Sequence, residues 1–287
     1  MSDGDRARRL RSLLTVPANR ADLVAKAPRS APDAVFLDLE DGVPADAKID
    51  ARADALVAAA ELREIAPSLQ VFVRVNGLTT PWFVGDIAEA LDRQLTGVVV
   101  PKVESIDDVA VVVDALAQAK RADVGICAGI ESAAGVARAE DILRLPVHWC
   151  YFGAEDFIAD MGGIRTPTNH EVMYARSRVA LAARVGGVHA LDQIVADFRD
   201  DARYIREAEE ARALGYKGKI CIHPAQVPLA NDAFTPSKEE VDRARRLLAA
   251  YEEAATRGEA TIAFEGEMVD EPMARRARTV LEAVDDV

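Results

Sequence analysis

Short apolar or β-branched runs alternate with longer amphipathic segments along most of the chain. The apolar runs predict buried strands over residues 12–16, 34–39, 71–75, 97–100, 124–130, 149–153, 188–191 and 219–222. Between them, segments such as 46–65, 81–95 and 105–120 carry apolar residues at helical spacing. Most of the strand runs are continuously apolar, which is typical of parallel strands covered on both faces.

Strict alternation of strand and helix favours a parallel sheet, and eight repeats favour an α/β fold of the closed (β/α)8 TIM barrel type. A doubly wound open sheet is the alternative. That fold normally carries a glycine-rich turn after its first strand, whereas the first run here ends in TVPANR, without glycine. We therefore expect a barrel domain over residues 1–233.

The pattern changes after the eighth run. A charged amphipathic helix is predicted over residues 237–258, with Ser237 as its N-cap and Glu240 three residues further on. A short strand, a turn at Gly266 and a final helix should follow. We expect residues 234–287 to form a helical extension, a lid or arm that packs over a neighbouring subunit.

Composition and charge narrow the class of protein. The chain is 50% apolar and 29% charged, which is ordinary for a soluble enzyme. Its net charge of −13 argues against binding to nucleic acid or to an anionic membrane surface. No apolar run approaches the roughly 18 residues of a membrane span.

Two further features favour a cytoplasmic location. The N-terminal stretch MSDGDRARRLRS is polar and basic without an apolar segment, so no signal peptide is expected. The cysteines, Cys127, Cys150 and Cys221, all lie in apolar runs and are predicted to be buried, reduced thiols.

Polar side chains collect where the predicted strands end. Active sites of TIM barrels form at the C-terminal ends of the strands, where each strand passes into its loop. The residues found at these positions are Glu40, Asp41, Arg74, Asn76, Lys102, Glu131, Ser132, Glu155, Asp156 and His223. The charges of these side chains alternate in sign along the chain, so this end of the barrel is expected to bind both a metal ion and an anion.

The residue types indicate a chemistry. Carboxylates from separate strands can hold Mg²⁺ or Mn²⁺, which prefer hard oxygen ligands and leave positions for substrate and water. Such an ion can chelate an α-keto acid and stabilise an enolate. An arginine on the opposite side supplies a forked donor for a carboxylate or for the enolate oxygen. This set suits making or breaking a carbon–carbon bond next to a carbonyl group.

Each candidate also has an ordinary structural explanation. Glu131 could stabilise the dipole of the helix that follows it, and Asp156 could be a helix N-cap. Arg74 could simply pair with Glu40 or Asp41. The remaining candidates also have possible structural roles. Lys102 could be solvated or face a phosphate, and His223 could only satisfy a backbone group. Asp270 could be the N-cap of a helix that starts with proline.

An ordered set of motifs resembles one family. The motifs are RSLLTVPANR, VFLDLEDGVPADAK, VRVNGLTTPW, GVVVPKVES, AGIESAAGV, FGAEDFIADMGG, YARSRVALAAR, GKICIHPAQV, NDAFTPSKEEV and EGEMVDEPMARRA, and they span residues 11 to about 276. In this order they resemble the citrate lyase β-subunit-like branch of the HpcH/HpaI aldolase family, which includes lyases of malyl-CoA and citramalyl-CoA. The resemblance implies a TIM barrel with a C-terminal extension.

The resemblance also implies roles for individual residues. Glu131 in IES and Asp156 in GAED look like the Mg²⁺ ligands, and Asp156 also contributes to substrate binding. Arg74 in VRVN looks like the residue that holds the substrate carboxylate and steadies the enolate. By the same resemblance, Glu40 and Asp41 would orient bound water and the arginine, and Lys102 would help to bind substrate. Asp270 in MVDEP looks like the acid/base that a neighbouring subunit delivers.

The implied activity is that of a Mg²⁺-dependent lyase or synthase. It would convert a malyl-, citramalyl- or citryl-type 3-hydroxyacyl-CoA into an acyl-CoA and an α-keto acid, with the CoA thioester as substrate. A malyl-CoA-type thioesterase that uses the same metal, and a non-catalytic regulatory barrel, are the alternatives. A tail that crosses between subunits predicts a homotrimer or homohexamer.

Overall fold

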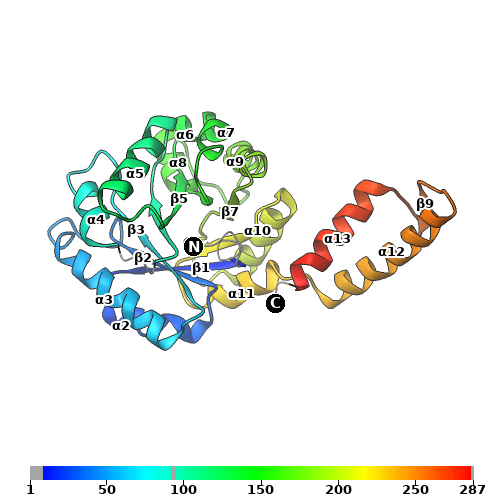
Figure 1. Cartoon of the computed structure of the whole chain (residues 1–287), viewed down its shortest axis with the longest axis horizontal. Coiled ribbons are helices and arrows are strands. Elements are labelled where there is room, and N and C mark those ends of the chain that lie inside the picture. The colour runs from blue at the N-terminus through cyan, green and yellow to red at the C-terminus, as the bar shows by residue number, and fades with distance from the viewer. Residues whose placement is uncertain (1–8, 92–94, 286–287) are drawn as a thin grey trace. The chain divides into compact units, whose positions relative to one another are not determined.

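The structure is a computed structural model that describes residues 9–91 and 95–285. Parallel strands β1 to β8 form a closed barrel in sequence order, in which β8 pairs with β1 (Figure 1). This confirms the predicted fold class. The strands are β1 (Ser12–Pro17), β2 (Ala34–Asp38), β3 (Gln70–Arg74), β4 (Gly97–Val100), β5 (Gly125–Ile130), β6 (Trp149–Phe152), β7 (His189–Asp192) and β8 (Gly218–Cys221).

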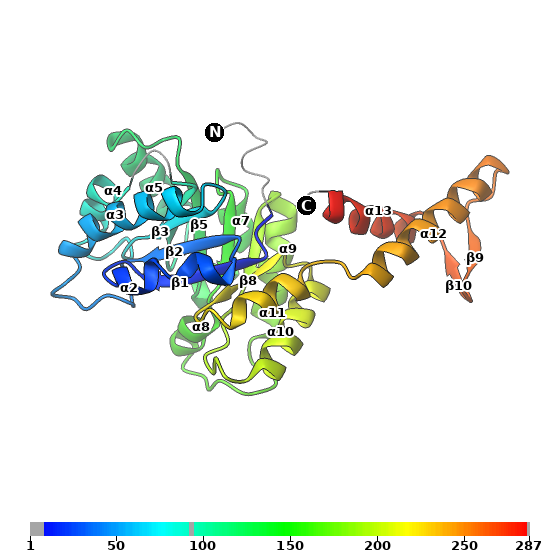
Figure 2. The same cartoon turned by 90° about the horizontal axis from the view of Figure 1, so that it is seen from below.

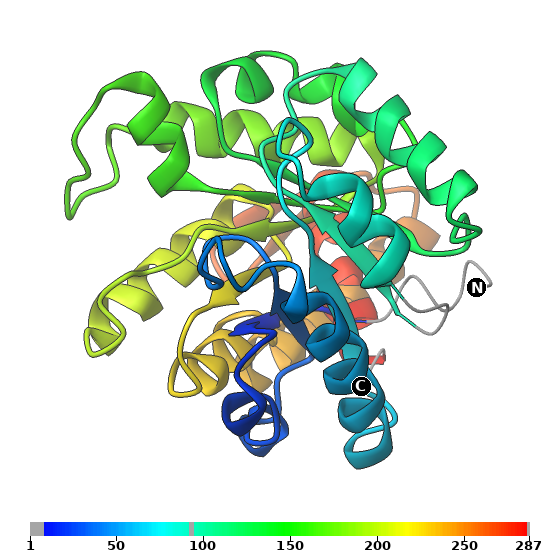
Figure 3. The same ribbon diagram turned by 90° about the vertical axis from the view of Figure 1, so that its left-hand side faces the viewer.

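Helices surround the strands, as Figure 3 shows. They are α2 (Ala21–Val24), the 3-10 helix η1 (Ala27–Ser30), α3 (Asp50–Ile65), α4 (Phe83–Glu89), α5 (Ile106–Gln118), α6 (Ala133–Ala137), α7 (Ala139–Leu143), α8 (Ala154–Met161), α9 (Met173–Gly186), α10 (Asp201–Leu214) and α11 (Gln226–Ala233).

The predicted strands agree with the observed ones to within about one residue at each end. The helix expected over 81–95 is shorter and ends at Glu89. Its predicted continuation through 92–94 lies outside the described residues, as do residues 1–8 of the polar N-terminal stretch on which the expectation about a signal peptide was based. Cys127, Cys150 and Cys221 are buried free thiols, as predicted. None of the described helices has the length and apolar character needed to cross a bilayer.

Aromatic rings fill the interior of the barrel. Phe72 packs edge-on against Phe36 and Trp149, with ring centroids 5.8 and 5.1 Å away. Glycines on neighbouring strands make room for these rings: a Cβ at Gly97 would lie 2.8 Å from the Phe72 ring, and one at Gly125 would lie 2.3 Å from the Trp149 ring. The interior is therefore a packed core that closes the barrel beneath the loops.

A buried ionic network lies outside the barrel, between its strands and α9 and α10. Asp192 and Lys219 are neighbours in the β7–β8 register, and their side-chain atoms Oδ2 and Nζ are 2.5 Å apart. Arg176 of α9 donates to both Asp192 oxygens at 2.7 and 2.9 Å. Lys219 also lies 3.8 Å from Glu207 of α10. All four side chains are fully buried, so each charge depends on its partners.

Residues from Thr235 onward form a second compact unit. Helix α12 (Lys238–Thr256) begins at the predicted N-cap, where Ser237 and Glu240 form a capping box. Strands β9 (Ile262–Phe264) and β10 (Glu267–Val269) precede α13 (Glu271–Asp285) (Figure 2). The prediction of a single short strand was wrong, because Glu265 and Gly266 both adopt positive φ, which closes a two-residue hairpin turn.

Asp192→Asn should lower the free energy of unfolding by about 3–5 kcal/mol, because it leaves two buried cations short of a counter-charge. Urea unfolding at pH 7 measures the change. Burial would raise the Asp192 pKa, but Lys219 and Arg176 outweigh it and hold the pKa below its ordinary value. The stabilisation should therefore be present at neutral pH and be lost as pH falls through the folded pKa.

The control is Asp22→Asn, which removes an exposed pair with Arg20 and should change stability by less than about 1 kcal/mol. Equal effects of the two substitutions would contradict the role of the buried network.

Candidate active site

An ion pair between neighbouring strands anchors the C-terminal end of the barrel. Asp38 ends β2 and Arg74 ends β3, and the two residues are partners in the strand register. Arg74 donates from Nε and Nη2 to the two Asp38 carboxylate oxygens at 2.7 and 2.8 Å. Asp38 also accepts the backbone N–H groups of Glu40 and Gly42. It thus fixes both the arginine and the loop that follows β2.

Glu40 extends this pair toward the next strands. One of its oxygens lies 3.2 Å from Nη1 of Arg74, and the other accepts a hydrogen bond from Nζ of Lys102 at 2.8 Å. Lys48 donates to the Glu40 backbone carbonyl at 2.7 Å and so holds the loop in place. The structural pairing considered for Arg74 is therefore observed with Glu40. Asp41 is exposed at the rim.

Lys102 connects three carboxylates. Besides its bond to Glu40, its Nζ lies 3.4 Å from Asp156, and its backbone N–H donates to Glu131 at 2.9 Å. Its φ of 53° is unfavourable for a residue with a side chain, and such strain is concentrated at functional sites. Lys102 is thus paired with carboxylates, while its side chain remains 40% exposed.

Glu131 is 3% exposed and follows β5. Its carboxylate lies against the backbone of two glycines: a Cβ at Gly153 would lie 2.4 Å from one oxygen, and a Cβ at Gly129 would lie 2.9 Å from the other. Burial raises the pKa of Glu131 to about 7; Arg74 and Lys102 lower it, while Glu40 and Asp156 raise it further. The anion is therefore undercompensated by the surrounding protein.

The N-cap explanation for Asp156 does not hold, and Glu131 does not lie in the first turn of the helix that follows it. Ser132 is the N-cap of α6, where it accepts the N–H of Gly135 at 3.1 Å, so Glu131 lies before that helix. Asp156 lies within the first turn of α8, and Gly153 is the N-cap. Neither carboxylate is occupied by capping a helix.

Both acids line one cavity of about 240 Å³ at the C-terminal end of the strands. Its apolar wall includes Phe36, Tyr151, Ile194, Ile220 and Ile222. Its polar wall includes Asp41, Arg74, Glu131, Glu155 and Asp156.

The donor set of this cavity fits Mg²⁺, which proteins commonly hold through one or two carboxylates while water and substrate complete the shell. Residues 9–91 and 95–285 contain no group of three or more His, Cys, Asp or Glu side chains placed to hold a metal. Glu131 and Asp156 therefore suit an ion that the substrate also binds.

Three other expected polar residues have local hydrogen-bond partners. Asn76 donates from its backbone and its side chain to Asp86, at 2.9 and 2.7 Å. His223 accepts the backbone N–H of Ala225 at 3.2 Å, which confirms the backbone-acceptor explanation. Asp270 belongs to the second unit, where its carboxylate accepts the N–H of Met273 at 3.4 Å at the start of α13.

Two residues of the site were missed in the sequence. Asp38 and Tyr151 lie inside apolar runs, so the sequence pattern indicates only that they belong to strands. Side chains alternate along a strand, so Asp38 shares the inward face with Phe36, and Tyr151 shares it with Trp149. Their even spacing from these inward-facing aromatic residues is the signal in the sequence that could have identified them.

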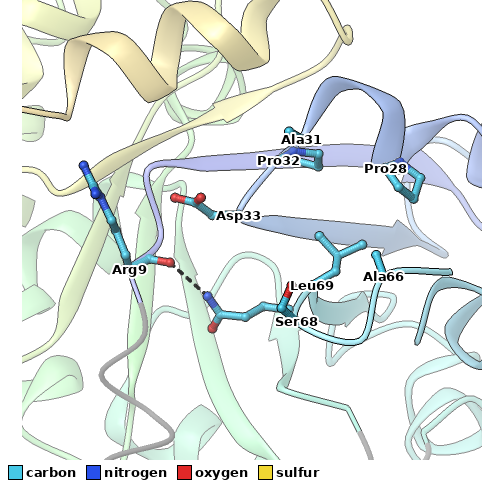
Figure 4. A pocket seen from close by; sticks show the side chains of 9 residues that line it. Arg9, Pro28, Ala31, Pro32, Asp33, Ala66, Ser68 and Leu69 are labelled. Atoms are coloured by element: carbon cyan, nitrogen blue, oxygen red, sulfur yellow. Dashed lines mark hydrogen bonds between the residues drawn. The ribbon is translucent and has the colours of Figure 1, made fainter. Parts of the chain in front are cut away.

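A separate hollow of about 400 Å³ lies at the opposite end of the strands (Figure 4). It is lined by residues that precede or begin strands, including Asp33 and Gln70. Arg11 occupies both Asp33 oxygens at 2.8 and 2.7 Å, and the Gln70 amide donates to the Arg9 carbonyl. The polar groups of this hollow are already paired within the protein, and active sites of TIM barrels form at the C-terminal end of the strands, so we place the active site at that other end.

Comparison with known proteins identifies the family. The model of the HpcH/HpaI aldolase/citrate lyase family matches residues 11–224. The chain belongs to the HpcH/HpaI aldolase/citrate lyase family. Among its relatives, the citrate lyase subunit beta-like protein of Deinococcus radiodurans is 53% identical over 95% of this chain and 96% of its own.

Two further members indicate the chemistry of the family. The L-malyl-CoA/beta-methylmalyl-CoA lyase of Cereibacter sphaeroides is 35% identical over 96% of this chain and 94% of its own. The structure of CitE from Mycobacterium tuberculosis in complex with magnesium, acetoacetate and coenzyme A is 33% identical, with a TM-score of 0.81 over 98% of this chain and 99% of that one. This family member is thus a carbon–carbon lyase of the CoA-ester type, and the non-catalytic alternative is set aside.

Gly153→Ala should reduce activity about 100-fold with little change in thermal stability. The backbone at this position has φ −100° and accepts alanine, but the new Cβ would displace the Glu131 carboxylate. Steady-state kinetics and thermal melting measure the two effects.

Gly77→Ala is the matched control, because a Cβ there has only one side-chain atom within 4 Å, at 3.9 Å. If both variants kept wild-type activity, the position of Glu131 would not matter to the reaction.

Proposed function

We propose that this protein is a Mg²⁺-dependent lyase that cleaves or forms a malyl-, citramalyl- or citryl-type 3-hydroxyacyl-CoA through an enolate, with an acyl-CoA and an α-keto acid as the other reactants. One observation carries the proposal: Glu131 and Asp156 line the same cavity as the guanidinium of Arg74.

The charge of the site supports a divalent cation. Four carboxylates, Asp38, Glu40, Glu131 and Asp156, surround two cationic side chains, Arg74 and Lys102. When all are ionised, two negative charges remain uncompensated, and the burial of Asp38, Glu40 and Glu131 makes that imbalance costly. Glu131 and Asp156 would hold Mg²⁺, which when bound supplies Lewis-acid polarisation of the substrate oxygens.

Arg74 is oriented for substrate. Asp38 holds its Nε and Nη2, so the guanidinium plane is fixed and its remaining edge lies at Glu40 and the cavity. A prealigned cation of this kind can bind the keto acid carboxylate and stabilise negative charge as it grows on the reacting oxygen. Glu40, Asp41 and Lys102 border the same region and position the arginine and bound water.

The base is assigned to Asp270 of a neighbouring subunit, in a homotrimer or homohexamer. In the condensation direction, this carboxylate takes the α-proton of the acyl thioester. The resulting enolate carbon forms a bond to the keto carbon, and the new alkoxide takes up a proton to give the 3-hydroxyacyl-CoA. Cleavage is the reverse of these steps.

A coupled assay of malyl-, methylmalyl-, citramalyl- and citryl-CoA, with and without Mg²⁺, tests the activity. Formation of a keto acid together with an acyl-CoA supports the lyase. Release of free CoA without a keto acid would instead identify the thioesterase, in which the same cavity activates water. No reaction with any of the four thioesters would overturn the proposal.

Glu131→Ala should abolish both Mg²⁺ binding and activity, because one of the two proposed ligands is lost. Isothermal titration with Mg²⁺ measures binding independently of turnover. Glu155→Ala is the control, since Glu155 lines the cavity but pairs with Arg165 at 2.9 Å. Unchanged Mg²⁺ affinity in Glu131→Ala would remove it from the ligand set.

Asp270→Asn should lose most of its turnover, by about 100-fold or more, while it still binds keto acid with wild-type affinity. The amide keeps the size of the side chain but cannot accept the proton. Glu271→Gln, at the neighbouring position, is the control and should stay active. Full turnover by Asp270→Asn would exclude it as the base.

A further inference from the structure

Tyr151 presents a buried hydroxyl to the cavity. Its side chain extends from β6 into the barrel, where the residue is 3% exposed and lines the cavity. The ring packs edge-on against Phe36 at a centroid distance of 6.3 Å, so its orientation is fixed by the interior core. Within the described part of the chain, its Oη has no hydrogen-bond partner.

The other fully buried tyrosines show the usual arrangement. The hydroxyl of Tyr204 lies 3.1 Å from Sγ of Cys221, and that of Tyr216 donates to the Arg176 carbonyl at 2.8 Å. A buried hydroxyl without a partner costs free energy, and such groups are rare in folded proteins. Tyr151 is thus distinguished by a donor that the protein does not use internally.

The position of this hydroxyl suggests its partner. A Cβ placed on Gly129 would lie 2.6 Å from Tyr151 Oη and 2.9 Å from a Glu131 oxygen, so the phenol and that carboxylate flank the same point of the backbone. Arg74 also acts on the phenol electrostatically. Burial first, and then Glu131, raise the Tyr151 pKa well above its ordinary value, so the group remains a neutral donor at working pH.

We propose that the Tyr151 hydroxyl donates a hydrogen bond to an oxygen of the α-keto acid, and of the matching part of the 3-hydroxyacyl thioester, beside Glu131 and Arg74. The inference rests on the proposed function and adds a binding residue to it. The keto acid is the fragment concerned because it is small enough for a cavity of about 240 Å³, to whose lining Phe36 and Ile220 contribute apolar side chains.

Tyr151→Phe tests the assignment, because it removes one oxygen and keeps the ring. Isothermal titration of the full-length protein at saturating Mg²⁺ measures the binding of pyruvate, glyoxylate and oxaloacetate. We expect at least one keto acid to bind to the wild type, and its affinity to fall about tenfold or more in the variant. The affinity for acetyl-CoA should be unchanged, and the melting temperature should not fall.

Tyr216→Phe is the matched control. It removes a buried hydroxyl that already has a partner, so the melting temperature should fall while keto acid affinity stays at the wild-type value. Equal keto acid affinity of wild type and Tyr151→Phe would overturn the inference, as would a wild type that binds none of the three acids.

The outcome is separable from that of the proposed function. If the wild type binds keto acid, the variant binds it weakly, and neither turns over any CoA thioester, the Tyr151 assignment stands and the lyase proposal fails. If turnover is normal in the wild type and keto acid affinity is unaffected by the substitution, the lyase proposal stands and the Tyr151 assignment fails.

Discussion

The ion pair between Asp38 and Arg74 determines how the C-terminal end of the barrel is arranged. It depends on the register of β2 and β3, because a shift by one residue would turn one of the two side chains out of the barrel. Through Asp38 the pair also fixes the loop after β2, and through Arg74 it orients Glu40. Glu40 in turn accepts a hydrogen bond from the Lys102 side chain, and Glu131 accepts one from the Lys102 backbone N–H. The polar side chains of four strands are therefore aligned by one contact.

Two of the ionic assemblies among the described residues have opposite properties. In the network outside β7 and β8, the nearby cations lower the Asp192 pKa by more than burial raises it, so the pKa lies below its ordinary value. At the C-terminal end of the strands, carboxylates exceed cations and the Glu131 pKa is raised to about 7. The first arrangement is complete without a ligand and serves folding. The second lacks positive charge, which distinguishes a binding site from a structural ion pair.

The sequence predicted the barrel well because continuous apolar runs and helical spacing are local signals that the closed sheet preserves. It also located Glu40, Arg74, Lys102 and Glu131, since strand ends meet at one edge of the barrel. Asp38 and Tyr151 were missed because one polar atom inside an apolar run hardly changes its pattern. The role proposed for Asp270 requires a neighbouring subunit, which local patterns do not specify; they indicate only its position before α13.

The rings inside the barrel occupy space left by glycines on the adjacent strands. The strands therefore share one interior volume: a side chain at Gly97 would compete for space with the Phe72 ring, and one at Gly125 would compete with the Trp149 ring. Phe36 and Tyr151 belong to this same packed cluster and also line the cavity. Selection for a bulkier substrate cannot simply shorten one of these rings, because the vacated volume would weaken closure of the sheet. Substrate range in this protein should therefore evolve through coupled substitutions on several strands, or through the loops around the rim.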